Sequence, residues 1–216
     1  MVSATAALIV VDLQEDFLPP NGALAVSGGR EVIGVINELM EKHDWRIILA
    51  SKDWHPRDHC SFASNNRAVK AFQKTTFKNP NNETEVKELT AWPDHCIQGT
   101  FGASLPDEFT GIQRVDKIIN KGFLSDREYY SAFQDVFSIH KTDLQDYLIN
   151  SGAQDVYITG LALDFCVYYT ALDAAKLGWN TFVVQDASKP VDPKSTQDVL
   201  LDLKAHGVHI VSSKDL

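Results

Sequence analysis

The sequence predicts a single-domain, three-layer α/β/α fold built around a mostly parallel six-stranded sheet. Short apolar runs rich in β-branched residues alternate with longer patterns typical of helices. The apolar runs are continuous, as expected for strands that helices cover on both faces. No internal repeat, low-complexity tract or Ser/Gly linker interrupts the 216 residues, so we expect residues 1–216 to form one domain.

Strands and helices are expected in alternating order over most of the chain. The strands are expected at residues 7–13, 46–52, 117–121, 156–160, 181–185 and 208–211. The helices are expected at residues 30–42, 141–150, 164–177 and 194–206. Thr142 has the residue type of a helix N-cap, and Gly152, Gly178 and Gly207 stand just past helix ends, where glycine commonly stops a helix.

Residues 54–109 are expected to be a long irregular region. The segment is rich in Asn, Pro, His and Trp and shows no clear period. Connections of this length are commonly functional, so we expect an active-site loop region here.

Composition and charge indicate which kinds of partner are disfavoured and in which cellular compartment the protein is expected. The net charge of -9 disfavours nucleic acid and anionic membrane surfaces as partners. The longest apolar run, Ala6 to Val11, is far too short for a membrane span and does not resemble a signal peptide. Three cysteines without a CxxC pair indicate reduced thiols. We therefore expect a cytoplasmic protein, with nuclear or peroxisomal pools left open.

Chemically active side chains stand at the carboxyl ends of four predicted strands. Asp12 ends the first strand, Asp53 and His55 follow the second, and Lys121 ends the third. The fourth runs into the segment from Gly160 to Cys166. Because ligands of open α/β sheets bind outside these strand ends, the residues are predicted to meet in one site.

Cys166 is a candidate nucleophile at the start of a predicted helix. Unpaired N–H groups of the helix and the Lys121 ammonium are expected to lower the pKa of its thiol. Asp12 could move a proton between the thiol and a leaving group, and the N–H groups of Ala162 and Cys166 could hold an oxyanion. The alternative is that Cys166 is a small buried apolar residue.

Asp53 and His55 are candidate ligands of a divalent metal ion. Residues two apart in extended chain point to the same side, and a carboxylate with imidazoles suits such an ion. His59 or His95 could supply a third ligand, and Glu128 is a further candidate. The alternative is a solvated loop with hydrogen-bonded histidines.

Aromatic residues near the same edge could enclose a flat ring, and core packing is the alternative. Those expected to bind substrate are Phe17, Trp92 and Tyr130.

Taken together, these motifs resemble the isochorismatase-like cysteine hydrolases, and among them the nicotinamidases of the eukaryotic, yeast-like form. The resemblance runs from about Leu8 to Val211. It rests on the strand ending at Asp12 with Gln14, Asp16 and Phe17, the Asp53-Trp54-His55-Pro56 loop, Trp92-Pro93 with His95-Cys96, the stretch from Lys121 to Phe133, and Gly160 with Ala162 and Cys166.

The resemblance implies the isochorismatase-like hydrolase fold and a nicotinamide-hydrolysing activity in NAD salvage. The family's catalytic triad falls on Asp12, Lys121 and Cys166, and its oxyanion hole on Ala162 and Cys166. A cis peptide is implied between Leu161 and Ala162. The metal ligands fall on Asp53, His55 and His95, for one divalent ion that holds the pyridine nitrogen. From the ligand types we expect zinc, with iron or manganese as alternatives. A homo-oligomer is also expected.

Three other functions fit parts of the pattern. The first is a related cysteine amidohydrolase that acts on a carbamoyl or ureido substrate and needs no pyridine-binding metal. The second is a binding or scaffold protein without activity, which the complete set of Asp12, Lys121 and Cys166 disfavours. The third is a redox-sensing thiol protein, in which oxidised Cys166 would form a disulfide with Cys60 or Cys96 as the resolving cysteine.

Overall fold

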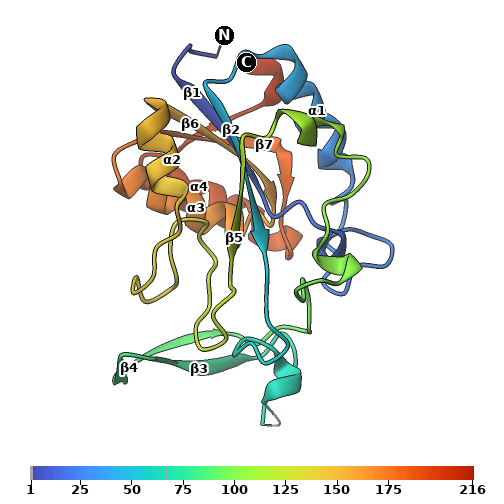
Figure 1. Cartoon of the computed structure of the whole chain (residues 1–216), viewed down its shortest axis with the longest axis vertical. Coiled ribbons are helices and arrows are strands. Elements are labelled where there is room, and N and C mark those ends of the chain that lie inside the picture. The colour runs from blue at the N-terminus through green and yellow to red at the C-terminus, as the bar shows by residue number, and fades with distance from the viewer. Residues whose placement is uncertain (1, 67) are drawn as a thin grey trace.

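Six parallel strands form the sheet at the centre of the structure, a computed structural model that describes residues 2–66 and 68–216. The spatial order is β5–β2–β1–β6–β7–β8, and each neighbouring pair is parallel (Figure 1). The predicted six-stranded sheet is therefore confirmed. Its strands are β1 (Ala6–Val11), β2 (Ile47–Asp53), β5 (Lys117–Lys121), β6 (Asp155–Leu161), β7 (Asn180–Lys189) and β8 (His209–Val211).

Helices cover both faces of the sheet and give the three layers that the sequence predicts. On one face, α1 (Glu31–Lys42) packs against alternate residues of β1 such as Leu8. On the other face, Ile9 and its neighbours pack against three further α-helices (Figure 1). These are α2 (Leu144–Ser151), α3 (Cys166–Lys176) and α4 (Thr196–Ala205). Successive strand residues point to opposite faces, which explains why the whole of β1 is apolar and buried.

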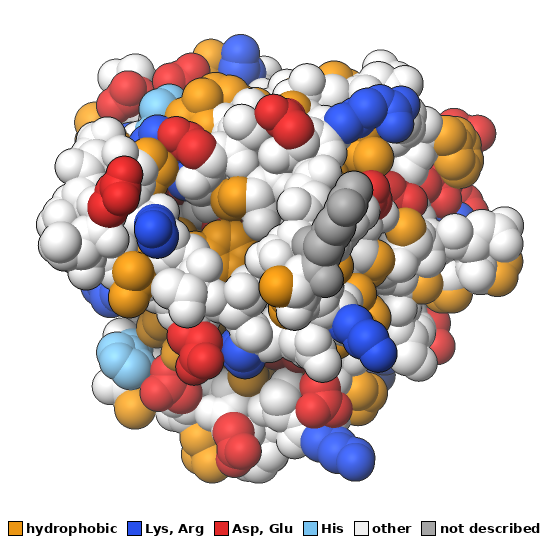
Figure 2. Space-filling model, turned by 90° about the horizontal axis from the view of Figure 1, so that it is seen from below, with side chains coloured by type: hydrophobic (Ala, Val, Ile, Leu, Met, Phe, Trp, Pro, Cys, Tyr) orange, Lys and Arg blue, Asp and Glu red, His pale blue; other side chains and the backbone are white. Residues whose placement is uncertain are grey.

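The prediction that residues 54–109 are irregular is wrong for part of the segment. An antiparallel hairpin is formed by β3 (Lys74–Asn79) and β4 (Asn82–Thr90). It lies beyond the carboxyl ends of β2 and β5, at the lower end of the molecule (Figure 1). Most of β4 is exposed to solvent, so it lacks the apolar alternation that reveals a strand in a sequence. Acidic and basic side chains are interspersed on the face seen from this end (Figure 2).

Helix ends follow the sequence signals closely. Gly152, Gly178 and Gly207 have φ angles of 74°, 99° and 81°, the left-handed conformation that ends a helix. The helix expected from residue 141 begins at Leu144, with Asp143 rather than Thr142 in the cap position. The Thr142 hydroxyl still accepts a hydrogen bond from the Leu144 N–H at 3.2 Å. None of the helices in the described residues is long and apolar enough to cross a membrane.

Candidate active site

Asp12, Lys121 and Cys166 meet inside the protein, just beyond the carboxyl edge of the sheet. The Nζ of Lys121 lies 2.9 Å from Oδ2 of Asp12 and 3.4 Å from Sγ of Cys166. The same ammonium donates a hydrogen bond to the Tyr129 carbonyl at 2.9 Å. All three side chains are buried, and those of Asp12 and Lys121 are fully so. The arrangement places a nucleophile, a cation and a carboxylate within reach of one another.

The chain conformation at the end of β1 holds Asp12 in this position. Its φ of 45° lies in the left-handed region, which Asp tolerates better than most residues. The Ser51 hydroxyl, from the neighbouring strand β2, donates to Oδ1 of Asp12 at 2.7 Å. The other oxygen, Oδ2, is left to face Lys121, and the Asp12 carboxylate and Cys166 Sγ lie within 4.8 Å of each other.

The pKa values of this group differ in one respect from the sequence-based expectation. Burial favours the neutral amine of Lys121, but the carboxylates of Asp12 and Asp53 raise its pKa well above the usual value. Burial raises the pKa of Asp12, and Lys121 opposes it. Burial also raises the pKa of the Cys166 thiol; Lys121 opposes the shift, and the carboxylates of Asp12 and Asp53 add to it. The prediction of a lowered thiol pKa is therefore wrong.

The turn from β6 into α3 carries the backbone groups that could hold an oxyanion. Gly160 has a φ of 105°, and a Cβ there would lie 2.0 Å from the Val11 carbonyl, so only glycine fits between β1 and β6. The peptide bond between Leu161 and Ala162 is cis. Within the described part of the chain, the N–H groups of Ala162 and Cys166 have no hydrogen-bond partner. They are available to a ligand.

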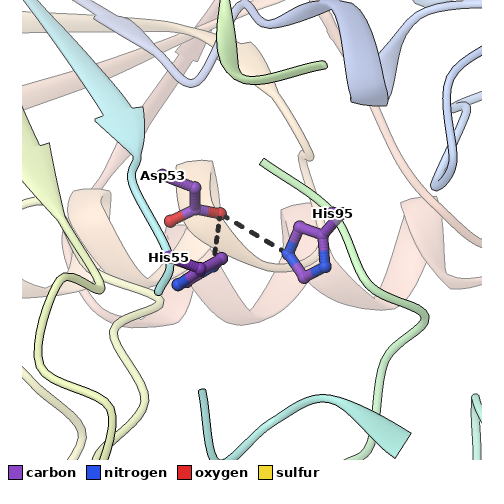
Figure 3. A group of neighbouring side chains, drawn as sticks. All are labelled: Asp53, His55 and His95. Atoms are coloured by element: carbon purple, nitrogen blue, oxygen red, sulfur yellow. Dashed lines mark ion pairs between the residues drawn. The ribbon is translucent and has the colours of Figure 1, made fainter. Parts of the chain in front are cut away.

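Asp53, His55 and His95 form a buried group beside the triad (Figure 3). The Nε2 atoms of His55 and His95 lie 3.6 Å and 3.9 Å from Oδ2 of Asp53. The Nδ1 of His55 contacts the Gly122 carbonyl at 2.9 Å, and that of His95 contacts the Pro93 carbonyl at 2.8 Å. Such contacts fix an imidazole with Nε2 free to bind a metal. The Nε2 of His55 is buried without a hydrogen-bond partner, which an ion would supply.

His59 and Glu128 lie next to this group, but only Glu128 has a polar side-chain atom without a hydrogen-bond partner. Both ring nitrogens of His59 are engaged, Nδ1 with the Ser61 hydroxyl at 2.8 Å and Nε2 with the Arg127 carbonyl at 3.0 Å. Glu128 accepts the Tyr129 N–H at 2.8 Å through Oε1, while its buried Oε2 has no partner. The structure thus favours His95 over His59 as third ligand and leaves one Glu128 oxygen available.

Gln14 holds Asp53 between the two groups and has no specific role in the sequence-based prediction. Its side chain accepts the Asp53 N–H at 2.7 Å and donates to the Asp53 carbonyl at 2.8 Å. The Oδ1 of Asp53 then accepts a hydrogen bond from the Lys121 ammonium at 2.6 Å, while Oδ2 faces His55 and His95. The sequence offers two signals for Gln14, its position directly after an apolar strand and its place among the motif residues that carry the resemblance.

A small, largely apolar pocket opens onto Cys166. Its wall includes the predicted aromatic residues Phe17, Trp92 and Tyr130, together with Asp53, His95, Glu128 and Ala162. Phe165, which the sequence left without a role, also lines it and packs edge-on against Trp92 with ring centroids 4.8 Å apart. All three cysteines, which lie in the described residues, are free.

Comparisons with known proteins agree with this geometry. The model of the Isochorismatase domain matches residues 6–215. The nicotinamidase of Saccharomyces cerevisiae is 42% identical over 211 residues, covering 94% of this chain and 98% of that protein. The crystal structure of the yeast nicotinamidase Pnc1p bound to the inhibitor nicotinaldehyde superposes with a TM-score of 0.91 at 40% identity, covering 96% of this chain and 99% of that one. The pyrazinamidase of Pyrococcus horikoshii, in complex with zinc, gives a TM-score of 0.74 at 34% identity, with 96% and 99% covered.

The isochorismatase-like hydrolase fold implied by the sequence is confirmed by these structures. The domain model spans nearly the whole chain, and the yeast relative aligns over almost its full length. The chain belongs to the isochorismatase family.

Proposed function

We propose that this protein is a nicotinamidase, which hydrolyses nicotinamide to nicotinate and ammonia and so returns nicotinamide to NAD synthesis. The observation that carries the proposal is the position of Asp53. One of its oxygens contacts Lys121 of the triad at 2.6 Å, and the other faces His55 and His95. A nucleophile and a set of metal ligands therefore share one carboxylate and one pocket. The named nicotinamidases among the relatives support this substrate.

The residues of the triad can carry out both halves of the hydrolysis. Sγ of Cys166 attacks the carboxamide carbon, and Asp12 accepts the thiol proton. The N–H groups of Ala162 and Cys166 stabilise the oxyanion. Asp12 returns the proton to the nitrogen as the carbon–nitrogen bond breaks, which releases ammonia and leaves a thioester. Water then adds to the thioester while Asp12 accepts its proton, and nicotinate leaves as the thiol re-forms.

The residues beside the triad fit a divalent metal ion, which we propose to be zinc. One carboxylate and two imidazoles with free Nε2 atoms are a suitable donor set, and they would be Asp53, His55 and His95. When bound, the ion supplies a Lewis acid for the ring nitrogen of the substrate. The aromatic wall of Phe17, Trp92 and Tyr130 encloses the ring. The cytoplasmic location and the homo-oligomer stay predictions from the sequence.

Ammonia release from nicotinamide tests the proposal directly. We expect activity in the purified protein, none in Cys166→Ala, and full activity in Cys60→Ala, a matched control at a partly buried thiol. Chelation should lower the activity and zinc should restore it, and benzamide, which lacks the ring nitrogen, should be a poor substrate. A metal-loaded, reduced protein that releases no ammonia from nicotinamide would overturn the proposal. Carbamoyl and ureido substrates would then be tried on the same samples.

A further inference from the structure

Asp164 lies in the turn between β6 and α3, two residues before Cys166, and the mechanism above does not use it. Its carboxylate accepts the N–H of Val191 at 2.8 Å through Oδ1 and the N–H of Asp192 at 2.9 Å through Oδ2. The Ser195 hydroxyl also contacts Oδ2, at 3.2 Å. These partners belong to residues 190–195, here called the strap, which follow the end of β7. One carboxylate thus joins two segments that are 27 residues apart.

The strap forms part of the active-site wall. Val191 lines the same pocket as Phe165 and Cys166. Its own N–H is one of the two that Asp164 holds, so the position of this wall depends directly on the carboxylate. Just before the strap, the Leu163 N–H donates to the Lys189 carbonyl at 2.8 Å and fixes the adjoining end of β7 to the same turn.

Other polar contacts of the strap do not replace this connection. The Asp192 carboxylate accepts the Lys194 N–H, and the Asp192 carbonyl accepts the Ser195 N–H, both at 3.0 Å and both within the strap. Across the residues that the structure describes, each side-chain hydrogen bond between the strap and the turn ends on Asp164. Hydrogen bonds from two adjacent N–H groups to one carboxylate are strong and directional. The two N–H groups bond to different oxygens, and an amide in place of the carboxylate would turn a donor NH2 group toward one of them.

We propose that Asp164 is a positioning residue that sets the size of the pocket through Val191 and steadies the turn that carries the oxyanion N–H groups. This proposal rests on the proposed nicotinamidase function. It makes the strap a determinant of substrate size, because Val191 limits the space beside the ring. Releasing the strap should weaken substrate binding and admit larger rings.

Steady-state kinetics of three variants test the proposal, with nicotinamide and a ring-methylated pyridine-3-carboxamide as substrates. Asp164→Asn breaks at least one hydrogen bond to the strap. Val191→Ala shortens the side chain that lines the pocket and leaves those hydrogen bonds in place. Asp192→Asn is the matched control within the strap. We expect Asp164→Asn to lower kcat/KM for nicotinamide roughly ten- to hundredfold, mainly through KM. Both Asp164→Asn and Val191→Ala should raise the preference for the methylated substrate, and the double variant should be less than additive. Asp192→Asn should match the wild type.

Hydrogen exchange gives a second readout that does not depend on activity. The amides of Val191 and Asp192 should exchange at least about tenfold faster in Asp164→Asn, and at the wild-type rate in Asp192→Asn. If the wild type is active but Asp164→Asn shares the KM, size preference and exchange rates of Asp192→Asn, the proposal is wrong. A wild type that releases no ammonia from nicotinamide contradicts the proposed function instead, and unchanged exchange would then still refute the role of Asp164. Should Asp164→Asn fail to fold, an unchanged size preference in Val191→Ala contradicts the proposal.

Discussion

Lys121 Nζ and Cys166 Sγ lie 3.4 Å apart, yet the pKa of the Cys166 thiol is raised and not lowered. Burial is the main cause, and the carboxylates of Asp12 and Asp53 add to it because both also lie close to the sulfur. The positive charge of Lys121 is shared among three neighbours and does not reverse the effect. A raised pKa favours the protonated thiol, so the proposed mechanism forms the nucleophile by proton transfer from Cys166 to Asp12.

The first prediction follows from this protonation state. Asp12→Asn removes the proton acceptor, so the thiol should stay protonated and kcat should fall roughly 10³-fold or more. The kcat of Cys166→Ala should fall at least as far. The kcat of the double variant, Asp12→Asn with Cys166→Ala, should be little lower still, because the two residues act as one unit. Rates of ammonia release check this, with thermal unfolding to show that the variants are folded. An Asp12→Asn enzyme that keeps most of its kcat would mean that the thiol ionises without Asp12.

The second prediction concerns the choice between His95 and His59 as metal ligand. His95→Ala removes a free Nε2 beside Asp53 and should reduce bound zinc, measured by elemental analysis, with metal affinity falling at least tenfold or so. His59→Gln keeps a donor toward the Arg127 carbonyl and should leave one zinc per chain. Loss of zinc in His59→Gln with retention in His95→Ala would assign the ligands the other way.

Much of this site follows from the sequence because its residues stand at strand ends. Parallel strands with helical crossovers bring their carboxyl ends to one edge, so Asp12, Asp53 and Lys121 had to come near one another once the strands were identified. The pairing of Asp53 with Lys121 in the register of β2 and β5 is a direct result. The turn to Cys166 leaves β6 at the same edge.

Other features depend on distances that a sequence does not contain. The direction of the Cys166 pKa shift is a balance between burial and three charges. His59 and His95 are the same residue type, and only their hydrogen-bond partners separate them. In the hairpin, β4 is mostly exposed and β3 buries little besides Phe77 and Asn79, so neither strand shows a clear apolar period. The contact of Asp164 with Val191 joins segments far apart in the chain.

The third prediction tests the close contact between Gly122 and His55. Gly122 has a φ of 68°, and a Cβ there would lie 2.3 Å from Cε1 of the His55 ring. Gly122→Ala should displace a metal ligand and lower zinc affinity roughly 10- to 100-fold, as changes beside metal ligands do. Gly178→Ala is the control, because Gly178 has a φ of 99° with open space around it. It should cost about 1 kcal/mol of stability and leave zinc binding unchanged. Equal zinc affinities in the two variants would show that the contact is not needed.

The last prediction concerns pH and the C-terminal segment, away from the metal ligands. Burial alone would raise the pKa of Asp186, but hydrogen bonds from the Ser213 hydroxyl, the Ser213 N–H and the Ser212 hydroxyl lower it below its usual value of 3.8. A lowered pKa in the folded state stabilises the fold above pH 3.8, and this stabilisation is lost as the pH falls through the folded-state pKa.

Asp186→Asn should therefore be less stable than the wild type at pH 7, by about 1 kcal/mol given the partial exposure of the carboxylate. Urea unfolding at a series of pH values measures the difference, which should shrink as the pH drops below about 4 because the wild-type carboxylate is then protonated as well. Asp44→Asn, at an exposed carboxylate, is the matched control and should keep the wild-type stability at pH 7. A deficit in Asp186→Asn that stays constant down to low pH would mean that the side-chain shape, and not its charge, anchors Ser212 and Ser213.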